Sequence, residues 1–534
     1  MTPTTTRRFG LVLLAVACLV FLPALGTREL WSPDEPRFAL IAEDMLQDGD
    51  FVVPHLLGRV YAEKPPLQIW LVVLTALPFG HVTEWAARFP SALAAIATVL
   101  LTGWFARRCF GEGAGFASAL VLMTSGHFFM RGRWSCTDTI LAFFFLGAVV
   151  LAFLWAEGKR WAGWGFFLAC ALATLTKGPV GLVLPAGILV AHLALEGRGR
   201  EIPRFPWISG TLLFAAIVLP WFLLYGMRAG GGELGVLVLR ENVDRFFHAW
   251  NNLRPFHYYL GRFPVSFLPW SVFLPAAAVA FFRARRDPAL SPLRLVVLWF
   301  VLVFLFFSVS SGKRTVYLLP IFPAAAIVLG WFFERGLVLV GGARSRGVRG
   351  SALALCAVLV LAAVAAPVAV ARIHPEAFRP TVGAAAILLL GSFPPVVHAW
   401  KGDTLRAVFW TSGALVATAL VTVLGIGPAF DSLQNVRSLA PRVARIVPPG
   451  ARFAAIRDKR EAFLFYSGLR GEEIATDDDL RRILGGAAPA YCLVHESDWS
   501  RVAARGDVPG EAVLRGTVST IGFALVSNEV RHAR

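Results

Sequence analysis

Acidic residues stand beside prolines twice in the stretch between the first two long apolar segments of the chain. The stretch contains Trp31-Ser32-Pro33-Asp34-Glu35-Pro36-Arg37 and, further on, Tyr61-Ala62-Glu63-Lys64-Pro65-Pro66. A carboxylate before a proline is typical of a residue that caps a helix start, here a helix over Pro36–Leu46. A cap needs one carboxylate, whereas two precede an arginine, so capping and catalysis explain Asp34 equally well at this point.

A further carboxylate, Asp138, opens an apolar segment and follows Arg131-Gly132-Arg133-Trp134. It also fits a helix cap, but an ionisable group at membrane depth costs free energy and usually marks a site. Two carboxylates on different loops supply the acid–base chemistry of a group transfer. One accepts the proton of the acceptor, and the other orients the acceptor or assists.

A phosphate leaving group needs cations rather than protonation. Lys177 interrupts Thr174-Leu175-Thr176-Lys177-Gly178-Pro179 between two apolar segments. It fits a snorkelling lysine or, in the interpretation that we prefer, a phosphate ligand at a helix N-terminus. The other candidate cations are Lys64, Lys313, Arg314, Arg245 and Arg37.

Apolar segments of membrane-spanning length must position these residues. The chain has 534 residues, of which 57% are hydrophobic and 16% charged, against about 25% charged in soluble proteins. A single soluble core cannot absorb so much apolar sequence, and runs of about 17 to 25 apolar residues recur from Phe9 to Pro428. The formal charge of +17 reflects Lys and Arg in short loops, as in membrane proteins, and not a nucleic-acid partner.

We predict thirteen spanning helices with the N-terminus inside, because this topology puts most basic loop residues in the cytoplasm. Residues 9–26 are interpreted as a retained first helix and not as a cleaved signal peptide. The apolar run Pro66–Phe79 is short, and counting it as a span would invert every later loop, so we predict an interfacial helix. The predicted spans are 9–26, 86–106, 114–130, 139–155, 161–176, 179–195, 207–225, 263–282, 293–309, 316–333, 350–371, 381–399 and 406–428.

Loops of unusual composition then share the outer face of the membrane. They are 27–85, 131–138, 177–179, 226–262 and 311–315. Their convergence predicts a site at the outer membrane–water boundary, for substrates with a lipid part and a polar head.

From about Asp431 the pattern changes to that of a small α/β domain, so residues 1–430 are predicted to form the membrane domain and 431–534 a domain outside it. Cys492 lies in a strand-like run and is predicted to belong to the core, and the absence of any CxxC disfavours a disulfide framework or a thiolate metal site. The predicted elements of the C-terminal domain are a helix over Val436–Ile446, strands at Arg452–Ile456 and Ala490–Val494, and a helix opening at Thr476.

Several motifs, in this order, resemble the GT-C glycosyltransferases that use lipid carriers. The resemblance is closest to the aminoarabinose transferases that modify lipid A, which are relatives of the protein O-mannosyltransferases. It covers the membrane domain through about residue 335, while residues 431–534 resemble that group only in place and size. The motifs are SPDEPRFALIAEDMLQDGDFVVPHLLGRVYAEKPPLQIWL, EWAARFPSALAAIATVLL, RWSCTDTILAFF, ATLTKGPVGLVLP, ENVDRF and SGKRTVYLLPIFP.

This resemblance implies an all-α membrane domain of the GT-C type, with juxtamembrane helices in the first outer loop. It also implies inverting transfer of a sugar, 4-amino-4-deoxy-L-arabinose or a similar one, from undecaprenyl phosphate to an acceptor such as lipid A. Asp34 matches the proposed catalytic carboxylate of the family and Asp138 a second carboxylate needed for activity. Positions that hold or surround the carrier phosphate match Lys64, Lys177, Arg245 and Tyr317, and positions lining the same cavity match Arg37 and Tyr61.

Glu63 matches a position that helps to hold zinc in the aminoarabinose transferases. Their partner histidine in a later outer loop is replaced here by Asn242. His248 and His257 lie in the same loop and are alternative ligands, although an exposed histidine is more often only solvated. We therefore expect no required cofactor.

Three alternatives remain open from the sequence. The acceptor fits a protein or another glycan as well as lipid A. A lipid transporter or flippase also needs many helices, but such folds place ionisable residues near the midplane and show inverted repeats, which this chain lacks. A scaffold protein would not need paired carboxylates beside Lys64-Pro65-Pro66. The expected location is the bacterial cytoplasmic membrane, with the site facing outside.

Overall fold

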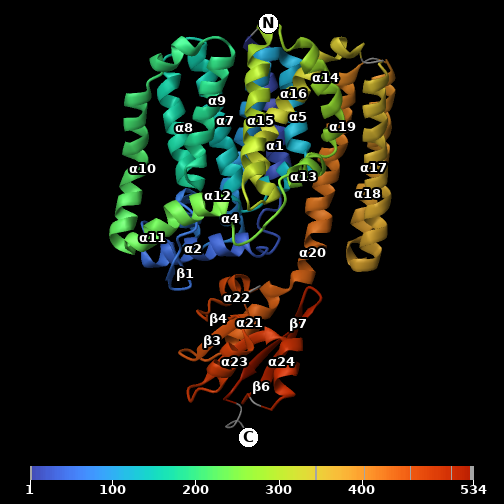
Figure 1. The fold of residues 1–534 in the computed structure, drawn as a ribbon. Helices are drawn as coiled ribbons and strands as arrows, with labels where there is room; N and C mark the ends of the chain where they lie inside the picture. Colours follow the sequence, from blue (N-terminus) through green and yellow to red (C-terminus); the bar gives the residue numbers. More distant parts are fainter. Residues whose placement is uncertain (1–2, 343–344, 402, 457–458, 507, 530–534) are drawn as a thin grey trace. The chain divides into compact units, whose positions relative to one another are not determined.

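The computed structural model describes residues 3–342, 345–401, 403–456, 459–506 and 508–529 (Figure 1). The chain divides into two compact units. The first, here called the helical unit, comprises Met1–Leu25, Ala62–Leu71 and Arg88–Gly425. The second, here called the mixed unit, comprises Gly26–Tyr61, Val72–Ala87 and Ile426–Arg534.

Among the described residues, eight helices are long and apolar enough to cross a membrane. Two further pairs of helices reach that length if each bent pair counts as one span, which makes up to ten. The eight are α4 (Glu84–Phe110), α7 (Thr137–Ala156), α10 (Trp207–Ala229), α15 (Ser291–Val309), α16 (Phe322–Glu334), α17 (Arg346–Ile373), α18 (Phe378–Lys401) and α19 (Thr404–Val421), some of them extended by short turns.

The predicted count of thirteen spans is not confirmed, although every predicted interval coincides with a helix or a bent pair. Three of the thirteen coincide with shorter helices: α1 (Pro3–Phe21), α8 (Ala162–Lys177) and α9 (Val180–Leu195). Two more are broken. The axis bends by 70° between α5 (Glu112–Thr124) and α6 (Gly126–Gly132), and by 111° between α13 (Tyr258–Ser266) and α14 (Leu274–Ala284).

The short apolar run in the first loop forms α3 (Leu67–Ala76) followed by a 3₁₀ turn. A helix of 10 residues is about 15 Å long, half the thickness of the hydrocarbon core of a bilayer. It cannot cross a membrane, as the sequence predicted. Helices α2 (Asp34–Asp48) and α3 are the juxtamembrane helices expected in this loop.

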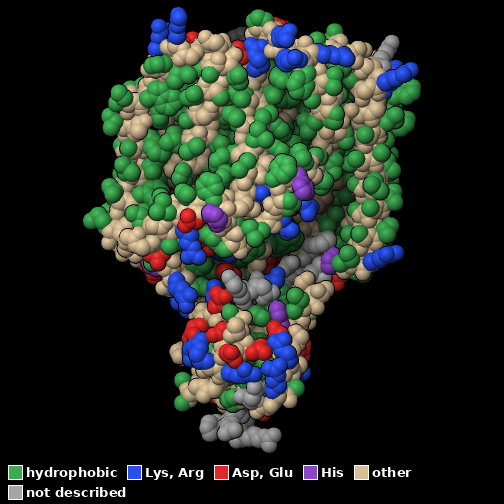
Figure 2. All heavy atoms as spheres, in the orientation of Figure 1, with side chains coloured by type: hydrophobic (Ala, Val, Ile, Leu, Met, Phe, Trp, Pro, Cys, Tyr) green, Lys and Arg blue, Asp and Glu red, His purple; other side chains and the backbone are tan. Residues whose placement is uncertain are grey.

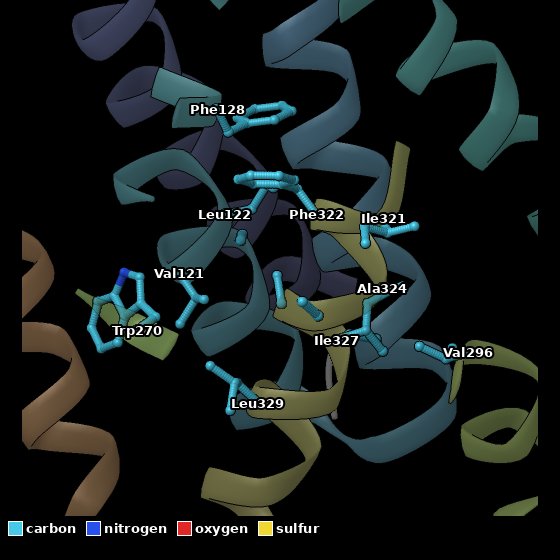
Figure 3. Close-up of a cluster of buried hydrophobic side chains, with 14 of the residues drawn as sticks. Val121, Leu122, Phe128, Trp270, Val296, Ile321, Phe322, Ala324, Ile327 and Leu329 are labelled. Atoms are coloured by element: carbon cyan, nitrogen blue, oxygen red, sulfur yellow. The ribbon is translucent and has the colours of Figure 1, made fainter. Parts of the chain in front are cut away.

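A core of aromatic and aliphatic side chains holds the helical unit together, and Figure 3 shows the part where α5, α16 and Trp270 meet. Trp270 donates its indole N–H to the Thr124 hydroxyl at 2.9 Å, so the largest buried side chain there has a polar partner. A Cβ at Gly330 of α16 would lie 2.0 Å from the Ser118 hydroxyl of α5. The two backbones approach closely through small residues, as helices in membranes commonly do.

The mixed unit contains a five-stranded sheet with the strand order β4-β3-β5-β7-β6. Strands β4, β3 and β5 are parallel, and β7 and β6 continue the sheet antiparallel. The elements after the helical unit are α20 (Gly427–Gln434), α21 (Val436–Ile446), β3 (Arg452–Ile456), α22 (Arg460–Ser467), β4 (Glu472–Ile474), α23 (Asp477–Leu484), β5 (Ala490–His495), α24 (Glu496–Ala503), β6 (Glu511–Val518) and β7 (Ile521–Ser527).

Side chains of successive residues in β3 and β5 lie on opposite faces of the sheet and belong to two separate hydrophobic cores. Phe453 and Leu493 pack with α21 and α22 on one face, whereas Ala454 and Cys492 pack with α23 and α24 on the other. Cys492 is fully buried, and burial raises the pKa of its thiol to about 12, so the prediction of a core cysteine is confirmed. The six cysteines of the chain are free thiols.

Residues from the first loop belong to the core of the mixed unit. Leu40 of α2 is buried in the same cluster as Val436 and Phe463. Glu29 accepts the backbone N–H groups of Val436 at 3.2 Å and Arg437 at 2.9 Å, the first two residues of α21. A carboxylate at a helix N-terminus satisfies donors that have no partner within the helix. Glu29 therefore links the loop to α21.

Glu29 should make the stability of the protein depend on pH. Burial, with Asp431 nearby, raises its pKa from 4.5 to about 7 despite the two N–H groups. Because the folded pKa lies above the unfolded one, the stabilisation is fully present below pH 4.5 and declines as the pH rises through about 7. Glu29→Gln keeps an acceptor oxygen but cannot ionise. As the pH rises through about 7, the free energy of unfolding of the variant should therefore fall by about 1–2 kcal/mol less than that of the wild type.

Thermal unfolding of the purified protein at several pH values between about 5 and 8 checks this expectation. Glu511→Gln, which neutralises an exposed carboxylate on β6, is the matched control and should follow the wild type. Parallel pH profiles of wild type and Glu29→Gln would mean that Glu29 does not cause the dependence.

Candidate functional site

Asp138 and Lys177 of the helical unit form an ion pair between the start of α7 and the end of α8. Both side chains are largely buried. The Lys177 ammonium also lies 4.3 Å from the ring centroid of Tyr317, in the 3₁₀ turn before α16, so it contacts an anion and an aromatic face. Three of the predicted site residues therefore meet, from segments far apart in the sequence.

Asp138 does not cap α7. The N-cap residue is Cys136, whose side chain makes no capping bond, and Asp138 is the second residue of the helix. Its carboxylate is 5% exposed and is also contacted by the Thr137 hydroxyl at 3.5 Å. The structure thus excludes the cap and shows a buried, paired carboxylate, and the catalytic role of Asp138 stays a prediction.

Lys177 does not lie at a helix N-terminus, and the sequence prediction was wrong on this point. It is the last residue of α8, and Gly178 ends the helix with a φ of +87° that L side chains rarely adopt. Helix α9 begins at Val180, with Pro179 as its N-cap. A cation at the C-terminus of α8 is stabilised by the negative end of that helix dipole.

Lys64 of the helical unit is half-buried in the loop before α3, and its ammonium donates to the Glu63 carbonyl oxygen at 2.9 Å. Burial, together with the positive charges of Lys177 and Arg245, lowers its pKa to about 8. Glu241 and Glu63 offset part of this effect. Cations that repel one another in a partly dry site favour binding of an anion.

Arg245 directly follows a π-helical turn over Val236–Asp244, a rare conformation that is frequent at functional sites. Its guanidinium pairs with Glu241 at 2.5 Å and donates to the Asn251 side-chain oxygen at 3.1 Å. The sequence analysis missed the role of Glu241. The four-residue spacing from Glu241 to Arg245, which favours pairing on one helix face, was the signal that would have found it.

Asn242 has a structural role in the same turn. Its amide donates to the Leu237 carbonyl oxygen at 2.8 Å. Its side-chain oxygen lies 2.6 Å from the place that a Cβ on Gly178 would take. The π-helical turn thus packs against the end of α8, and Gly178 is needed for this approach.

The described residues do not fit a zinc site at Glu63, which the family resemblance had suggested. No group of three or more His, Cys, Asp or Glu among them is placed to hold a metal ion. Glu63, His248 and His257 are exposed. Asn242, at the position of the histidine ligand, donates its amide to backbone carbonyls.

Lys313 is not part of the Asp138–Lys177 cluster. Its side chain is 3% exposed, and the ammonium donates to the carbonyl oxygens of Arg254, at 3.0 Å, and of Ser310. Burial lowers its pKa. These bonds hold the 310–314 turn, so the structure gives Lys313 a structural role.

Asp34, Arg37 and Tyr61 belong to the mixed unit. Helix α2 begins at Asp34, two residues before the predicted start, and Pro33 at the N-cap makes no side-chain bond. Arg37 lies 3.9 Å from the Glu461 carboxylate of α22. Tyr61 is buried, and its backbone N–H donates to the Pro54 carbonyl oxygen at 2.8 Å.

The two carboxylates of the Asp34-Glu35 pair differ in their surroundings. Glu35 is fully buried, pairs with Arg28 at 3.0 Å and accepts the Trp31 backbone N–H at 3.0 Å. Asp34 is half-buried at the first position of the helix. Glu35 therefore folds the loop, and the catalytic role predicted for Asp34 stays a prediction.

Residues 7–230 match the family described as dolichyl-phosphate-mannose-protein mannosyltransferase. Undecaprenyl phosphate-alpha-4-amino-4-deoxy-L-arabinose arabinosyl transferase 2 of Pseudomonas fluorescens is 30% identical over 447 residues, which cover 80% of this chain and 73% of that protein. The enzyme of the same name from Sodalis glossinidius is 31% identical, with 78% and 76% covered. An uncharacterized protein of Aquifex aeolicus is 34% identical over 61% of this chain and 64% of its own length.

The fold is similar to that of a solved structure. The crystal structure of ArnT from Cupriavidus metallidurans, bound to undecaprenyl phosphate, superimposes with a TM-score of 0.84 over 98% of each chain, at 22% identity. This agreement confirms the GT-C fold that the sequence motifs implied.

Proposed function

The chain belongs to the family of undecaprenyl phosphate-α-4-amino-4-deoxy-L-arabinose arabinosyl transferases, and from this premise we propose that it transfers such a sugar from undecaprenyl phosphate to lipid A. It is a multi-pass membrane glycosyltransferase. Beyond this class of enzyme, we propose the substrates, the inverting course of the reaction, and a reaction site on the outer side of the bacterial cytoplasmic membrane.

The observation that carries the proposal is the group of cations in the helical unit. The positive charges of Lys177 and Arg245 both lower the pKa of Lys64, as expected of residues that surround one anion. A phosphate linked to a sugar supplies that anion, and its departure leaves a second negative charge that the same cations stabilise. No proton has to be delivered to this leaving group.

Asp138 keeps Lys177 in place. The buried carboxylate holds the ammonium at the end of α8, so the lysine need not be ordered when the carrier binds. The phosphate then shares this cation with the Asp138 carboxylate. We assign Asp138 to positioning of the donor phosphate.

Asp34 is assigned as the base. In an inverting transfer the acceptor attacks the anomeric carbon on the side opposite to the leaving phosphate. The new bond to the acceptor oxygen forms as the bond to the phosphate oxygen breaks. The acceptor's proton passes to Asp34, if the acceptor carries one at that oxygen.

Mass spectrometry of envelope lipids from cells with and without the protein tests the proposal. Lipid A should lose the mass of the added sugar when the protein is absent, and expression of the wild type should restore it. Loss of the sugar from a protein or another glycan instead would replace lipid A as the acceptor. If the glycoconjugates of cells without the protein are unchanged and their sugar-linked carrier is confined to the inner leaflet, the protein is a transporter of the carrier and not a transferase.

The orientation is tested separately. In Figure 2, Lys and Arg side chains gather at the end of the helices where the N-terminus lies, beyond a broad hydrophobic band. Arginines near the end of α14 and between α16 and α17 are exposed, namely Arg283, Arg285, Arg286, Arg335 and Arg346. They support a cytoplasmic location of this end. A reporter fused after Arg349 should therefore report the cytoplasm and one fused after Phe430 the outer side. The opposite pattern would put the cation group on the wrong face.

A further inference from the structure

A cavity of about 330 Å³ lies within the mixed unit, apart from the residues assigned above to catalysis. Its walls come from α2, from residues 81–84, and from α21, α22 and the turn after α22. The polar groups that line it and that carry the argument are Glu43, Asp44, Glu84, Arg437, Tyr466 and Arg470.

Each guanidinium in the wall has a carboxylate partner. Arg437 pairs with Glu84 at 2.6 Å, and Arg470 pairs with Asp44 at 3.1 Å. The carboxylates are largely buried, whereas 59% of the Arg470 side chain is exposed. The Tyr466 hydroxyl donates to Glu84 at 3.2 Å. Glu43 adds a third carboxylate, which accepts the Val82 backbone N–H and the Gln47 amide, both at 2.6 Å. The cavity thus has two ion pairs, one hydrogen-bonded carboxylate and no excess of cations.

This charge pattern selects the chemistry of a ligand. An inorganic or lipid phosphate would meet a carboxylate beside each arginine, and a polyamine would meet an arginine beside Asp44 and beside Glu84. A neutral ligand with several hydroxyl groups can donate to the carboxylates and accept from the guanidiniums at once.

Apolar side chains form another part of the wall. Leu40, Leu57, Phe465 and Leu469 line the cavity together with the polar groups. Such a surface suits the C–H face of a sugar ring, and the polar groups beside it suit the ring hydroxyls.

We propose that this cavity binds a sugar ring of the acceptor glycan, at a distance from the group that reacts. Asp34 begins α2 and Glu43 lies nine residues along the same helix, so the two are separated by about 14 Å along the axis. The cavity therefore recognises a neighbouring part of the acceptor and not the sugar being transferred. The assignment to the acceptor rests on the proposed function, whereas the sugar chemistry of the cavity does not.

Binding measurements on the purified full-length protein test the chemistry. The probes are an N-acetylated glucosamine disaccharide, inorganic phosphate and spermidine. The disaccharide should bind, and Arg470→Ala or Asp44→Asn should weaken its binding about tenfold or more, because each removes a hydrogen bond to a charged group. No disaccharide binding to the wild type at about 10 mM, or equal affinity in the variants, would overturn the proposal. So would phosphate or spermidine binding that the same variants abolish.

Kinetics test the assignment to the acceptor. Arg470→Ala should raise the KM for the acceptor about tenfold with little change in kcat, and should leave the KM for the donor unchanged. The control is Arg501→Ala, which removes a similarly exposed arginine that pairs with Asp477 at 2.8 Å, outside the cavity. An unchanged acceptor KM in Arg470→Ala, with active wild type, would overturn the assignment. Disaccharide binding that depends on Arg470 in a wild type without transferase activity would instead overturn the proposed function alone.

Discussion

Asp34→Asn is expected to lower turnover by about 10²–10⁴-fold while carrier affinity and stability stay close to those of the wild type. Asparagine has the same size but neither takes a proton nor carries a charge. Asp34 is half-buried and follows Pro33, which provides no side-chain cap. Turnover, carrier affinity and melting temperature should be measured on the same purified variant.

Glu35→Gln is the matched control for this prediction, because it removes the neighbouring charge. Glu35 is buried and bonded to Arg28 and to the Trp31 N–H, so its loss should lower the melting temperature by leaving Arg28 without that partner. Near-normal turnover in Asp34→Asn with a lowered melting temperature would show that Asp34 is structural. The role of base would then pass to Asp138.

Lys64→Ala is expected to weaken binding of undecaprenyl phosphate by about 10- to 100-fold, because it removes a charge-assisted contact of roughly 1.5–3 kcal/mol. Burial and neighbouring cations hold the pKa of Lys64 near 8. In the wild type, affinity should therefore fall as the pH rises above about 8, where the free protein loses this positive charge. The variant should lack this part of the pH dependence.

Lys159→Ala, which removes an exposed lysine from the loop between α7 and α8, is the control and should bind the carrier as the wild type does. Affinity that is unchanged in Lys64→Ala at every pH would remove Lys64 from the phosphate site. A carrier titration at several pH values gives both results.

Lys177→Ala should behave differently from Lys64→Ala, because it leaves the buried Asp138 without its cation. Such a loss usually costs about 3–5 kcal/mol of stability. The double variant Asp138→Asn, Lys177→Ala should recover much of this stability and still bind the carrier weakly. Equal stability of the single and double variants would show that the pair is not coupled.

Local patterns predicted the elements of this protein well. The helix Val436–Ile446 and the strand Arg452–Ile456 have the predicted limits, since each is marked by a hydrophobic period of its own. The predicted helix at Thr476 opens with a capping box, in which the Thr476 hydroxyl accepts the Asp479 N–H. The hydropathy pattern located each apolar helix, including the short α8 and α9, but it could not show that α13 and α14 form a sharp bend.

Pairings over long sequence distances could not be predicted from the same patterns. Glu29 bonds with residues more than 400 positions away, and no local signal marks it as their partner. Lys177 was found because it interrupts an apolar run, yet its pairing with Asp138 depends on how α7 and α8 pack. The family resemblance identified candidate residues but did not indicate that Lys313 is held by backbone carbonyls.

The inclusion of residues 26–61 and 72–87 in the mixed unit limits how the protein can be recombined with its relatives. The C-terminal residues do not form an interchangeable module, because Leu40 and Glu29 complete their core and the start of α21. A chimera that exchanges residues 426–534 alone would pair these side chains with a foreign surface. Exchange of the first loop and the C-terminal residues together would preserve the contacts of Leu40 and Glu29. Asp34 would then be exchanged with them, because it lies in the same loop.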